Sequence, residues 1–502
     1  MVSSELEKCW REIQMGAVMT FPTKIRGLCT KSNSDTFSVQ RLSFSQQLTN
    51  LMKKHLKPTS SRRDFIATGA AVFGFNIIPR HVLGAPGVPA PSEKLNIGCV
   101  GIGGQGGGVT RDLASFANVQ IAALCDVEQK HEATMAKAYP GRPFYKDYRE
   151  MLANEKGLDA VMVGTPDHWH APISLAAMKL GKHVYCEKPL AHTIEETRIM
   201  AKVASEMKVV TQMGNTGHAS EGLRLTKEWI DAVAIGAVKE VHVWSDRPGK
   251  FWDSQGKPRP TEKLPVPETL DWNQWQGAAP EHEYHPLYVP RKWRGWFDYG
   301  CGALGDMMVH NADPAWYALD LGAPTAVEAE CSETNADSFP VWSIVTWHFA
   351  AKGNRGPIKL TWYDGGKLPT PPAGFDPARK IGDNGILFLG DNGSIIAPGW
   401  CGTPRIVPES QMQSFKLPPH TIARSPGHRE EWVAACLAGK PEEAKANFAY
   451  AAPYTEALLT GVLPIRLGKR IEWDSAAMKA TNAPEADALI RKTYRKGFEL
   501  PV

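Results

Sequence analysis

Short apolar runs alternate with helical patterns through the first half of the chain. The apolar runs have the length of buried strands and occupy residues 97–102, 119–124, 158–163, 183–186 and 209–213. Apolar positions at helical spacing lie between them, over residues 109–116, 173–180 and 194–207. This alternation predicts an α/β fold with a parallel sheet and helices on both of its faces. Such sheets bind ligands beyond the carboxyl ends of their strands.

The pattern changes after Asn215. Further strands, several with alternating apolar and polar positions, are predicted over residues 238–244, 326–331, 343–349, 358–362 and 386–389. Helical patterns close the chain at residues 428–437, 453–463 and 484–498. We therefore expect one α/β domain over residues 93–215 and a second over residues 216–502.

A long segment rich in Pro and Trp, from Pro248 to Asp298, interrupts the second domain. Segments of this length without a regular pattern are usually functional or disordered. The aromatic residues in and around it, Trp296 among them, argue against disorder, and Arg294 adds hydrogen-bond donors. Two interpretations stay open, a lid over the substrate and a contact between subunits.

Composition agrees with an ordinary globular enzyme. The chain has 502 residues, of which 43% are hydrophobic and 22% charged, and its length suits about two or three domains. Basic residues near the amino terminus account for much of the net charge of +4. Because we see no basic stripe in the sequence, we expect no nucleic-acid partner. The cysteines beyond residue 92 lack close pairs and C-x-x-C spacing, which argues against a disulfide framework and a zinc site.

Residues 52–92 are similar to a twin-arginine (Tat) export signal followed by a linker. Arg62 and Arg63 precede an apolar stretch over residues 65–78, which is too short for a membrane span. The pattern predicts a periplasmic or other extracytoplasmic protein, which would stay cytoplasmic without a functional signal. Met52 would be a natural start, so residues 1–51 are an uncertain leader that a misassigned gene start explains.

A glycine-rich turn joins the first predicted strand to its helix. Its residues are Gly101, Ile102, Gly103, Gly104, Gln105 and Gly106. In a G-x-G-x-x-G turn the first glycine permits the bend, the second lets a pyrophosphate approach, and the third lets helix and strand pack closely. Free amides at the helix start then face the phosphates. Asp126, after the next strand, suits a ribose 2′-hydroxyl and repels the extra phosphate of NADP, so NAD is the expected cofactor.

The other predicted strands also end in polar residues. These are Thr165, Pro166, His168 and His170 after one strand, Glu187 and Lys188 after the next, and Asn215 and His218 after a third. Because the carboxyl ends of parallel strands meet at one edge of the sheet, we expect these residues to lie beside the cofactor or its substrate.

Oxidation of a secondary alcohol needs a base for the hydroxyl proton. Lys188 suits this role because a nearby positive nicotinamide lowers its pKa. Asp306 and His310 are four residues apart in a helical pattern, which puts both on one helix face. We expect His310 to be an acid–base residue with Lys188 as its partner and Asp306 as its support. Which of the two bases takes the proton first stays open.

Four motifs together resemble the Gfo/Idh/MocA family of oxidoreductases, and in particular its bacterial Tat-exported subgroup. The motifs are residues 101–106, 165–170, 187–189 and 302–310, and the resemblance runs from Leu95 to the carboxyl end. It implies a Rossmann parallel sheet followed by an α/β domain with a large open, mainly antiparallel sheet. It also implies action on sugars, inositols or related alcohols, and a homo-oligomer, dimer or tetramer. Lys188 would lie between nicotinamide and substrate, with Pro166 under the ring.

Several residues are candidate substrate contacts. They are Asn215, His218, Arg294, Trp296 and Asp313. A metal site at His168, His170, His282 and His285 is the weaker interpretation, because no carboxylate cluster completes a shell and nicotinamide chemistry needs no metal.

Three functions fit these residues. The leading hypothesis is NAD-dependent hydride transfer to or from a secondary alcohol of a sugar, polyol or glycoside. The second is an NAD-dependent glycoside hydrolase that works by transient oxidation and elimination, with tightly bound NAD recycled in each turnover. The third is a non-catalytic sugar-binding module.

Overall fold

The computed structural model describes residues 17–19, 77–79 and 93–501. The chain forms two compact units, Met1–Lys94 and Leu95–Val502. In the first unit the described strands β1 (Ala17–Met19) and β2 (Ile77–Pro79) pair in antiparallel fashion. The export signal expected around Arg62 and Arg63 lies outside the described residues.

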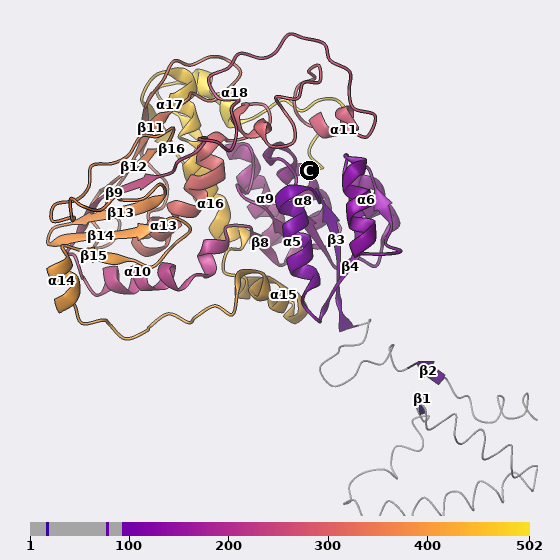
Figure 1. Ribbon diagram of the computed structural model, residues 1–502, viewed down its shortest axis with the longest axis horizontal. Coiled ribbons are helices and arrows are strands. Elements are labelled where there is room, and N and C mark those ends of the chain that lie inside the picture. The colour runs from indigo at the N-terminus through magenta and orange to yellow at the C-terminus, as the bar shows by residue number, and fades with distance from the viewer. Residues whose placement is uncertain (1–16, 20–76, 80–92, 502) are drawn as a thin grey trace, which may run out of the picture. The chain divides into compact units, whose positions relative to one another are not determined.

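The second unit begins with a six-stranded sheet in the order β5-β4-β3-β6-β7-β8 (Figure 1). The strands are β3 (Leu95–Val100), β4 (Val119–Cys125), β5 (Phe144–Tyr145), β6 (Ala160–Val163), β7 (His183–Cys186) and β8 (Thr211–Met213). All of their pairings are parallel. The chain reverses its direction of travel across the sheet between β3 and β6, which creates the crevice where such sheets bind ligands.

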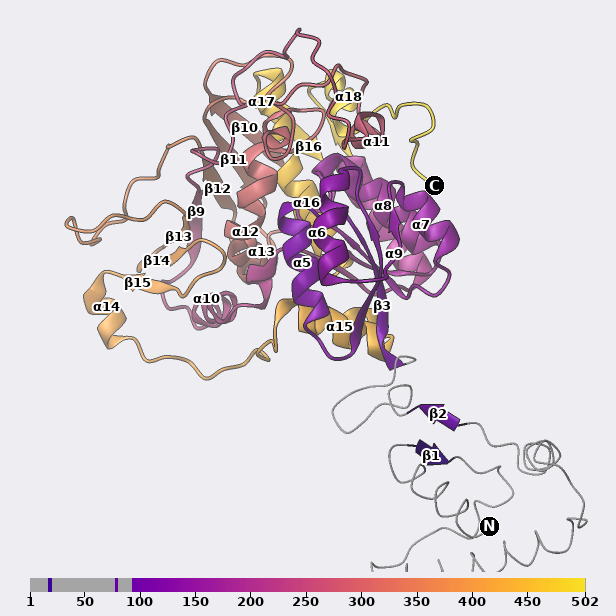
Figure 2. The same cartoon turned by 45° about the vertical axis from the view of Figure 1, so that its right-hand side comes forward.

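Helices cover both faces of this sheet (Figure 2). One face packs against α5 (Gly104–Ala114) and α6 (Gln129–Ala138), the other against α7 (Tyr148–Asn154), α8 (His170–Lys179) and α9 (Ile194–Met207). Helix α9 begins at a capping box, in which Thr193 and Glu196 satisfy each other's backbone amides. Strand β6 is buried along its whole length, as expected for a strand covered on both sides.

A nine-stranded sheet follows, in the order β15-β14-β13-β9-β12-β11-β10-β16-β17. Its strands are β9 (Val238–Trp244), β10 (Ala326–Cys331), β11 (Ser343–Phe349), β12 (Ile358–Tyr363), β13 (Gly385–Gly390), β14 (Gly393–Pro398), β15 (Arg405–Val407), β16 (Ile471–Asp474) and β17 (Lys479–Ala480). Only the β9–β12 pair is parallel among these described strands. The α/β fold with a Rossmann sheet and a second, mainly antiparallel sheet is thus confirmed.

Helices lie between the two sheets and join them. Helix α16 (Phe448–Leu459) packs against α9 and receives a hydrogen bond from the Trp347 indole of β11 at the carbonyl of Ala457. A π-helix (Leu304–Met308), α12 (Val309–Asn311) and α13 (Asp313–Leu319) lie beside it. Other helices of this part are α10 (Glu221–Asp231), α11 (Trp272–Gln276), α14 (Glu409–Ser414), α15 (His428–Ala438), α17 (Val462–Leu467) and α18 (Asp487–Ile490). Helix α15 returns to the Rossmann sheet and shares the apolar cluster of α5.

Two sequence-based expectations are wrong. The single helix expected around Asp306 and His310 is a π-helix followed by two short α-helices, with Pro314 in the first turn of the second. The helix expected over residues 484–498 is only a 3-10 turn (Pro484–Ala486) and α18, and the described residues after α18 contain no helix. Tertiary contacts hold this tail instead, because Lys492 pairs with buried Glu196 at 2.6 Å.

The Pro- and Trp-rich segment is ordered by its own aromatic core. Six of its aromatic side chains pack in one buried cluster with the adjacent Tyr299; the six are Trp272, Trp275, Tyr284, Tyr288, Trp293 and Trp296. Trp272 and Trp275 stack with ring centroids 4.8 Å apart. The cluster lies on the Rossmann domain, since the Trp169 indole donates to the carbonyls of Gln274 and Trp275.

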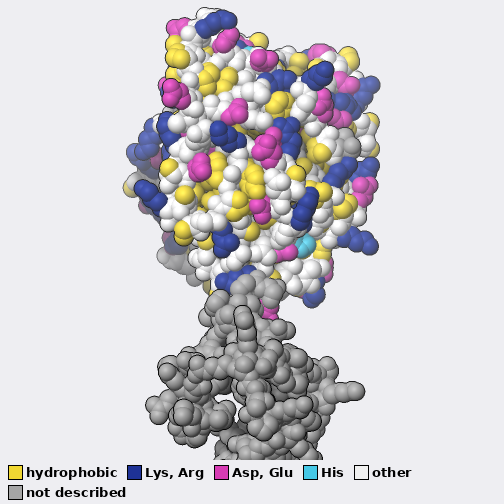
Figure 3. Space-filling view, turned by 90° about the vertical axis from the view of Figure 1, so that its right-hand side faces the viewer, with side chains coloured by type: hydrophobic (Ala, Val, Ile, Leu, Met, Phe, Trp, Pro, Cys, Tyr) yellow, Lys and Arg dark blue, Asp and Glu magenta, His cyan; other side chains and the backbone are white. Residues whose placement is uncertain are grey.

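Charges of both signs are interspersed on the face drawn in Figure 3, where basic and acidic side chains lie side by side. None of the helices in the described part of the chain has the length and apolar character needed to cross a membrane.

The close packing of Gly106 in the glycine turn leads to a testable prediction. A β-carbon at Gly106 would lie 1.9 Å from the carbonyl oxygen of Gly101, so Gly106→Ala forces α5 away from β3. We expect the free energy of unfolding to fall by about 2 kcal/mol or more, measured by urea denaturation. Gly108→Ala is the matched control in the same helix, because nothing lies within 4 Å of its β-carbon position. It should be neutral or stabilising by up to about 1 kcal/mol. Equal effects of the two substitutions would contradict the packing.

Candidate active site

The glycine turn has the geometry of a phosphate cradle. Gly101 has a φ of +75° and a β-carbon there would lie 2.6 Å from the Thr165 amide nitrogen, so only glycine fits. Gly103 is the N-cap of α5, without a side-chain hydrogen bond to the helix and without an acidic residue in the first turn. The space around Gly104 is open, since nothing lies within 4 Å of its β-carbon position. The start of α5 therefore offers free amides and its positive dipole end to an anion.

Asp126 lies beside this turn, directly after β4. Its carboxylate accepts hydrogen bonds from the amides of Ile102 and Glu128, both at 2.9 Å. His131 on α6 pairs with the same carboxylate at 2.9 Å, and this hydrogen bond raises the pKa of the imidazole against the opposing effect of burial. The imidazole also lies against Gly103, where a β-carbon would be 2.2 Å from Cε1. The sequence carried no signal for His131, because only the fold brings it to the glycine turn.

The buried polar atoms without a hydrogen-bond partner include four on residues that the sequence assigns to the site. They are Thr165 Oγ1, Glu187 Oε1, Asn215 Oδ1 and His310 Nδ1. Burial raises the pKa of Glu187, which Lys188 and Arg429 oppose. Buried polar atoms without partners are rare in folded proteins, so a group of them indicates partners supplied by bound molecules. Together with the glycine turn, these atoms fit a dinucleotide lying across the sheet edge.

Lys188 forms a buried ion pair with Asp306. Its Nζ lies 2.9 Å from Asp306 Oδ1 and donates to the Asp306 carbonyl at 2.9 Å, with side chains only 13% and 10% exposed. Arg294 donates to the same Oδ1 at 3.0 Å, and Arg247 lies 3.4 Å from Oδ2. Burial would raise the pKa of Asp306, but these three cations hold it well below its usual range. Arg247 was not predicted, because it lies in a proline-rich segment without a recognisable motif.

His310 is buried beside this ion pair and is not hydrogen-bonded to Asp306. Burial, helped by the positive charge of Lys188, lowers the pKa of His310 to about 3. The expectation that Asp306 orients His310 is therefore not met, since the carboxylate binds Lys188 and the two arginines. The reason is the π-helix at Leu304–Met308, whose wider turns do not align residues four apart. The imidazole is uncharged at neutral pH and faces the site as an acceptor or donor.

Asn215, His218 and Asp313 form one buried polar cluster. The Asp313 carboxylate is fully buried and accepts hydrogen bonds from Asn215 Nδ2 at 3.0 Å, His218 Nδ1 at 3.0 Å and the Tyr450 hydroxyl. We expected Asp313 to bind a substrate hydroxyl, but its oxygens are already engaged. Its place is behind Asn215 and His218, which it orients. Tyr450 lies on a helix far along the chain and was not predicted.

Trp296, His168 and His170 contact other parts of the protein in the structure, although the sequence predicts ligand contacts for them. Trp296 is fully buried in the aromatic cluster, and its indole donates to the carbonyl of Leu287 at 2.9 Å. Each ring nitrogen of His168 and His170 faces a backbone carbonyl at 2.7 to 3.2 Å. These rings hold the surrounding loops together. Among the described residues, no group of three or more His, Cys, Asp or Glu could hold a metal ion.

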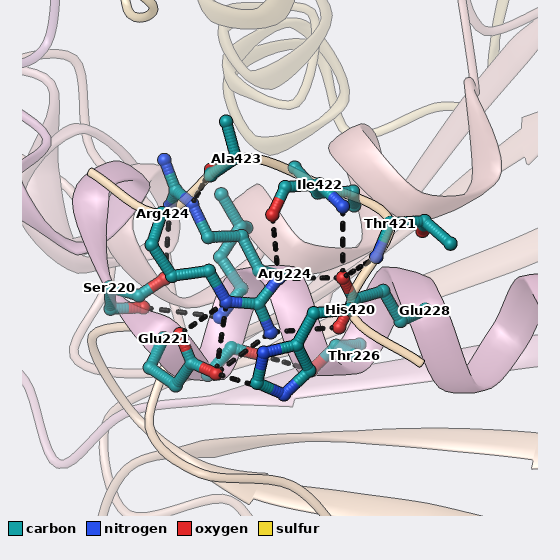
Figure 4. Close-up of polar contacts among 12 residues, drawn as sticks. Ser220, Glu221, Arg224, Thr226, Glu228, His420, Thr421, Ile422, Ala423 and Arg424 are labelled. Carbon is teal, nitrogen blue, oxygen red and sulfur yellow. Dashed lines mark hydrogen bonds and ion pairs between the residues drawn. The ribbon is translucent and has the colours of Figure 1, made fainter. Parts of the chain in front are cut away.

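The connection before α15 is fixed by an ion cluster, drawn in Figure 4. Arg424 donates to Glu221 and Glu228 of α10 from two edges of its guanidinium, with distances of 2.6 to 2.9 Å. Glu228 also accepts from the amides of Thr421 and Ile422. The start of α15 follows directly, and His428 Nε2 lies 2.9 Å from the Met213 carbonyl oxygen at the end of β8. The ion cluster thus fixes the connection before α15 to helix α10, which begins close to His218.

The low pKa of His310 predicts how stability depends on pH. An ordinary histidine binds a proton near pH 6.5, whereas folded His310 does so only near pH 3. The unfolded chain therefore binds more protons between these values, and the free energy of unfolding falls as the pH falls through this window. His310→Gln should reduce the slope of that dependence by about one proton, measured by urea denaturation from pH 7 to 4. His420→Gln, which removes an exposed imidazole, is the control, and an unchanged slope in His310→Gln would contradict the burial.

Comparisons with known proteins agree with this geometry. Residues 95–215 match the family model described as "Oxidoreductase family, NAD-binding Rossmann fold", and residues 230–355 match "Oxidoreductase family, C-terminal alpha/beta domain". A glycosyl hydrolase family 109 protein of Solibacter usitatus is 39% identical over 116 residues, which cover 21% of this chain and 26% of that protein. Inositol 2-dehydrogenase of Salmonella paratyphi B is 30% identical over 179 residues, or 35% of this chain and 51% of that enzyme.

Solved structures share the whole fold. The WlbA dehydrogenase from Bordetella pertussis, in complex with NADH and UDP-GlcNAcA, has a TM-score of 0.53 and 20% identity, over 76% of this chain and 99% of that one. GenD2 from gentamicin A biosynthesis, in complex with NAD, has a TM-score of 0.53 and 21% identity, over 80% of this chain and 100% of that one. The chain spans only a quarter to a half of the curated relatives named above. On its two matched domains, the chain belongs to the NAD-binding Gfo/Idh/MocA family of oxidoreductases.

Proposed function

We propose that the protein transfers hydride between NAD and a secondary alcohol of a sugar, polyol or glycoside. The observation that carries this proposal is the buried ion pair between Lys188, which comes soon after strand β7, and Asp306; it lies beside His310. When bound, NAD supplies the hydride acceptor or donor. The residues that would hold it are the turn 101–106, Asp126, Thr165, Pro166 and Glu187.

Lys188 and His310 are chemically complementary toward a hydroxyl group. Asp306 holds the Lys188 ammonium in place, and the ammonium can donate a hydrogen bond to the substrate oxygen. The uncharged His310 imidazole can accept a hydrogen bond from the substrate hydroxyl. The Asp306 carboxylate also pairs with Arg294 and Arg247, so its negative charge is divided among three cations and does not act on Lys188 alone.

Sugars and polyols are supported as the substrate class by two lines of reasoning. One relative is named inositol 2-dehydrogenase, and one solved neighbour is a dehydrogenase in complex with UDP-GlcNAcA. Within this chain, Asn215 and His218 are oriented by Asp313 beside the strand ends, and Arg294 is 23% exposed, so hydroxyl groups would meet both donors and acceptors there.

The same proposal includes export by the Tat pathway, NAD that stays bound, and a homo-oligomer. The twin arginines at 62 and 63 support export, because this route carries folded proteins together with their cofactors. Cell fractionation tests the location, mass spectrometry of the purified protein tests bound NAD, and light scattering tests assembly. A monomer found in the cytoplasm without nucleotide would contradict all three parts.

Cleavage of glycosides by transient oxidation is the second candidate. It is favoured by relatives named glycosyl hydrolase family 109 protein and alpha-N-acetylgalactosaminidase, the latter from Shewanella oneidensis with 31% identity over 150 residues. Those matches cover only 26% and 32% of the relatives, so the activity in their names enters here as a second proposal.

Lys188→Met tests the catalytic assignment. The substitution removes the ammonium but leaves Asp306 between two arginines, so the fold should persist. We expect kcat to fall by about a hundredfold to ten-thousandfold, with little change in the affinity for NAD measured by calorimetry. Lys202→Met, at a side chain 74% exposed, is the matched control and should behave as the parent. Equal activity of Lys188→Met and the parent would instead favour a non-catalytic sugar-binding module.

Turnover with limiting NAD separates the two candidate reactions. The protein is incubated with p-nitrophenyl N-acetyl-α-D-galactosaminide and other p-nitrophenyl glycosides at sub-stoichiometric NAD, and both p-nitrophenol and NADH are followed. Hydride transfer as the net reaction predicts at most one product molecule for each NAD supplied. Many molecules of p-nitrophenol for each NAD, without accumulation of NADH, would overturn it in favour of glycoside cleavage.

A further inference from the structure

Trp400 is an exposed tryptophan beside the candidate acid–base residue. It lies in the turn that follows strand β14, and its side chain is 43% exposed. Among the tryptophans of the described residues, it alone belongs to the large apolar side chains that are exposed. Its ring lies 6.1 Å from the His310 ring between centroids, with an angle of 34° between the planes. A flat apolar surface therefore borders the site.

The backbone is strained at Trp400 and at the next residue, Cys401. Trp400 and Cys401 both have a φ of +56°, in the left-handed region that residues with a β-carbon seldom adopt. Glycines 399 and 402 flank them, but neither has a positive φ. The turn thus places its strain on the tryptophan rather than on residues that would adopt this conformation freely. Such strain concentrates at sites that bind ligands.

The turn is fastened to the elements that carry the site. The Trp400 amide donates to Asn311 Oδ1 at 3.0 Å, and the Cys401 thiol donates to the His310 carbonyl at 3.4 Å. On the other side, the Ser220 hydroxyl donates to the Cys401 carbonyl at 2.8 Å. Gly222 permits this approach, because a β-carbon there would lie 2.3 Å from the same oxygen. The backbone that carries the indole is therefore held at a fixed position relative to His310.

We propose that Trp400 is a stacking platform for the apolar face of a pyranoside ring. This inference rests on the proposed function, because the ring would stack on the indole while one of its hydroxyls reaches Lys188 and His310. A pyranose presents C–H bonds on one face, which suit an aromatic surface, whereas an acyclic polyol has no such flat face. A platform that is already rigid loses little entropy on binding. The substrate class is thereby narrowed to molecules with a ring, such as cyclic sugars and their glycosides, and acyclic polyols are excluded.

Binding rather than turnover tests the platform. Methyl α- and β-D-glucopyranoside, methyl α- and β-D-galactopyranoside and the acyclic polyol D-glucitol are titrated by calorimetry into NADH-saturated protein, in which no oxidation proceeds. We expect Trp400→Ala to weaken pyranoside binding by about tenfold or more and Trp400→Phe to recover part of the loss. The affinities for NADH and for D-glucitol should not change. Leu417→Ala, which shortens another exposed apolar side chain at 64% exposure, is the matched control.

The outcomes distinguish this inference from the proposed function. Pyranoside affinities in Trp400→Ala and Trp400→Phe equal to those of the parent overturn the platform and leave the proposed function standing. Parent protein that binds NADH but none of the sugars overturns the proposed function, and the platform with it. If Trp400→Ala fails to fold, indole fluorescence decides: a change on adding a bound pyranoside, present in the parent and absent in Trp400→Phe, supports the platform, and an identical change in both overturns it.

Discussion

The ion pair between Lys188 and Asp306 is the interaction on which the site depends. Lys188 follows a strand of the Rossmann sheet, whereas Asp306 lies on the π-helix that packs against the second sheet. Separation of this buried pair, at 2.9 Å, is costly because the Lys188 ammonium would lose its carboxylate in a medium of low polarity. The pair therefore fixes the edge of one sheet relative to the helices of the other. Arg294 and Arg247 reinforce it from the connecting segments.

Close packing at the glycine turn brings the start of α5 up against the ends of the neighbouring strands. Gly101, Gly106 and Gly164 approach so closely that a β-carbon on any of them would lie within 2.8 Å of a backbone atom. The start of α5 and the ends of the neighbouring strands consequently converge on one crevice. Glu187, Asn215 and His310 each have a buried polar atom without a partner, and the Trp400 ring lies 6.1 Å from the His310 ring. Our proposals for cofactor binding, proton transfer and ring recognition rest on these residues.

Periodicity predicted the regular elements well because they follow local rules. The strands Val238–Trp244, Ala326–Cys331 and Ser343–Phe349 match the expected ranges, since alternating or continuous apolar positions specify a strand wherever it lies. The site was predicted less completely. Motifs led to Lys188, Asp306 and His310, but the π-helix that separates the last two leaves no trace in residue spacing. His131, Arg247 and Trp400 reach the site only through tertiary packing, and the burial of Asp313 and Trp296 likewise follows from neighbours remote in sequence.

A double-mutant cycle across the ion pair tests the central claim most directly. Lys188→Met, Asp306→Asn and the double variant are compared with the parent in the single-turnover rate of NADH formation on a substrate that the parent oxidises. If the two residues act as one unit, the double variant is no slower than the slower single variant, because the second substitution removes nothing further. Rate losses that multiply in the double variant would show that Lys188 and Asp306 act independently, and would contradict the account.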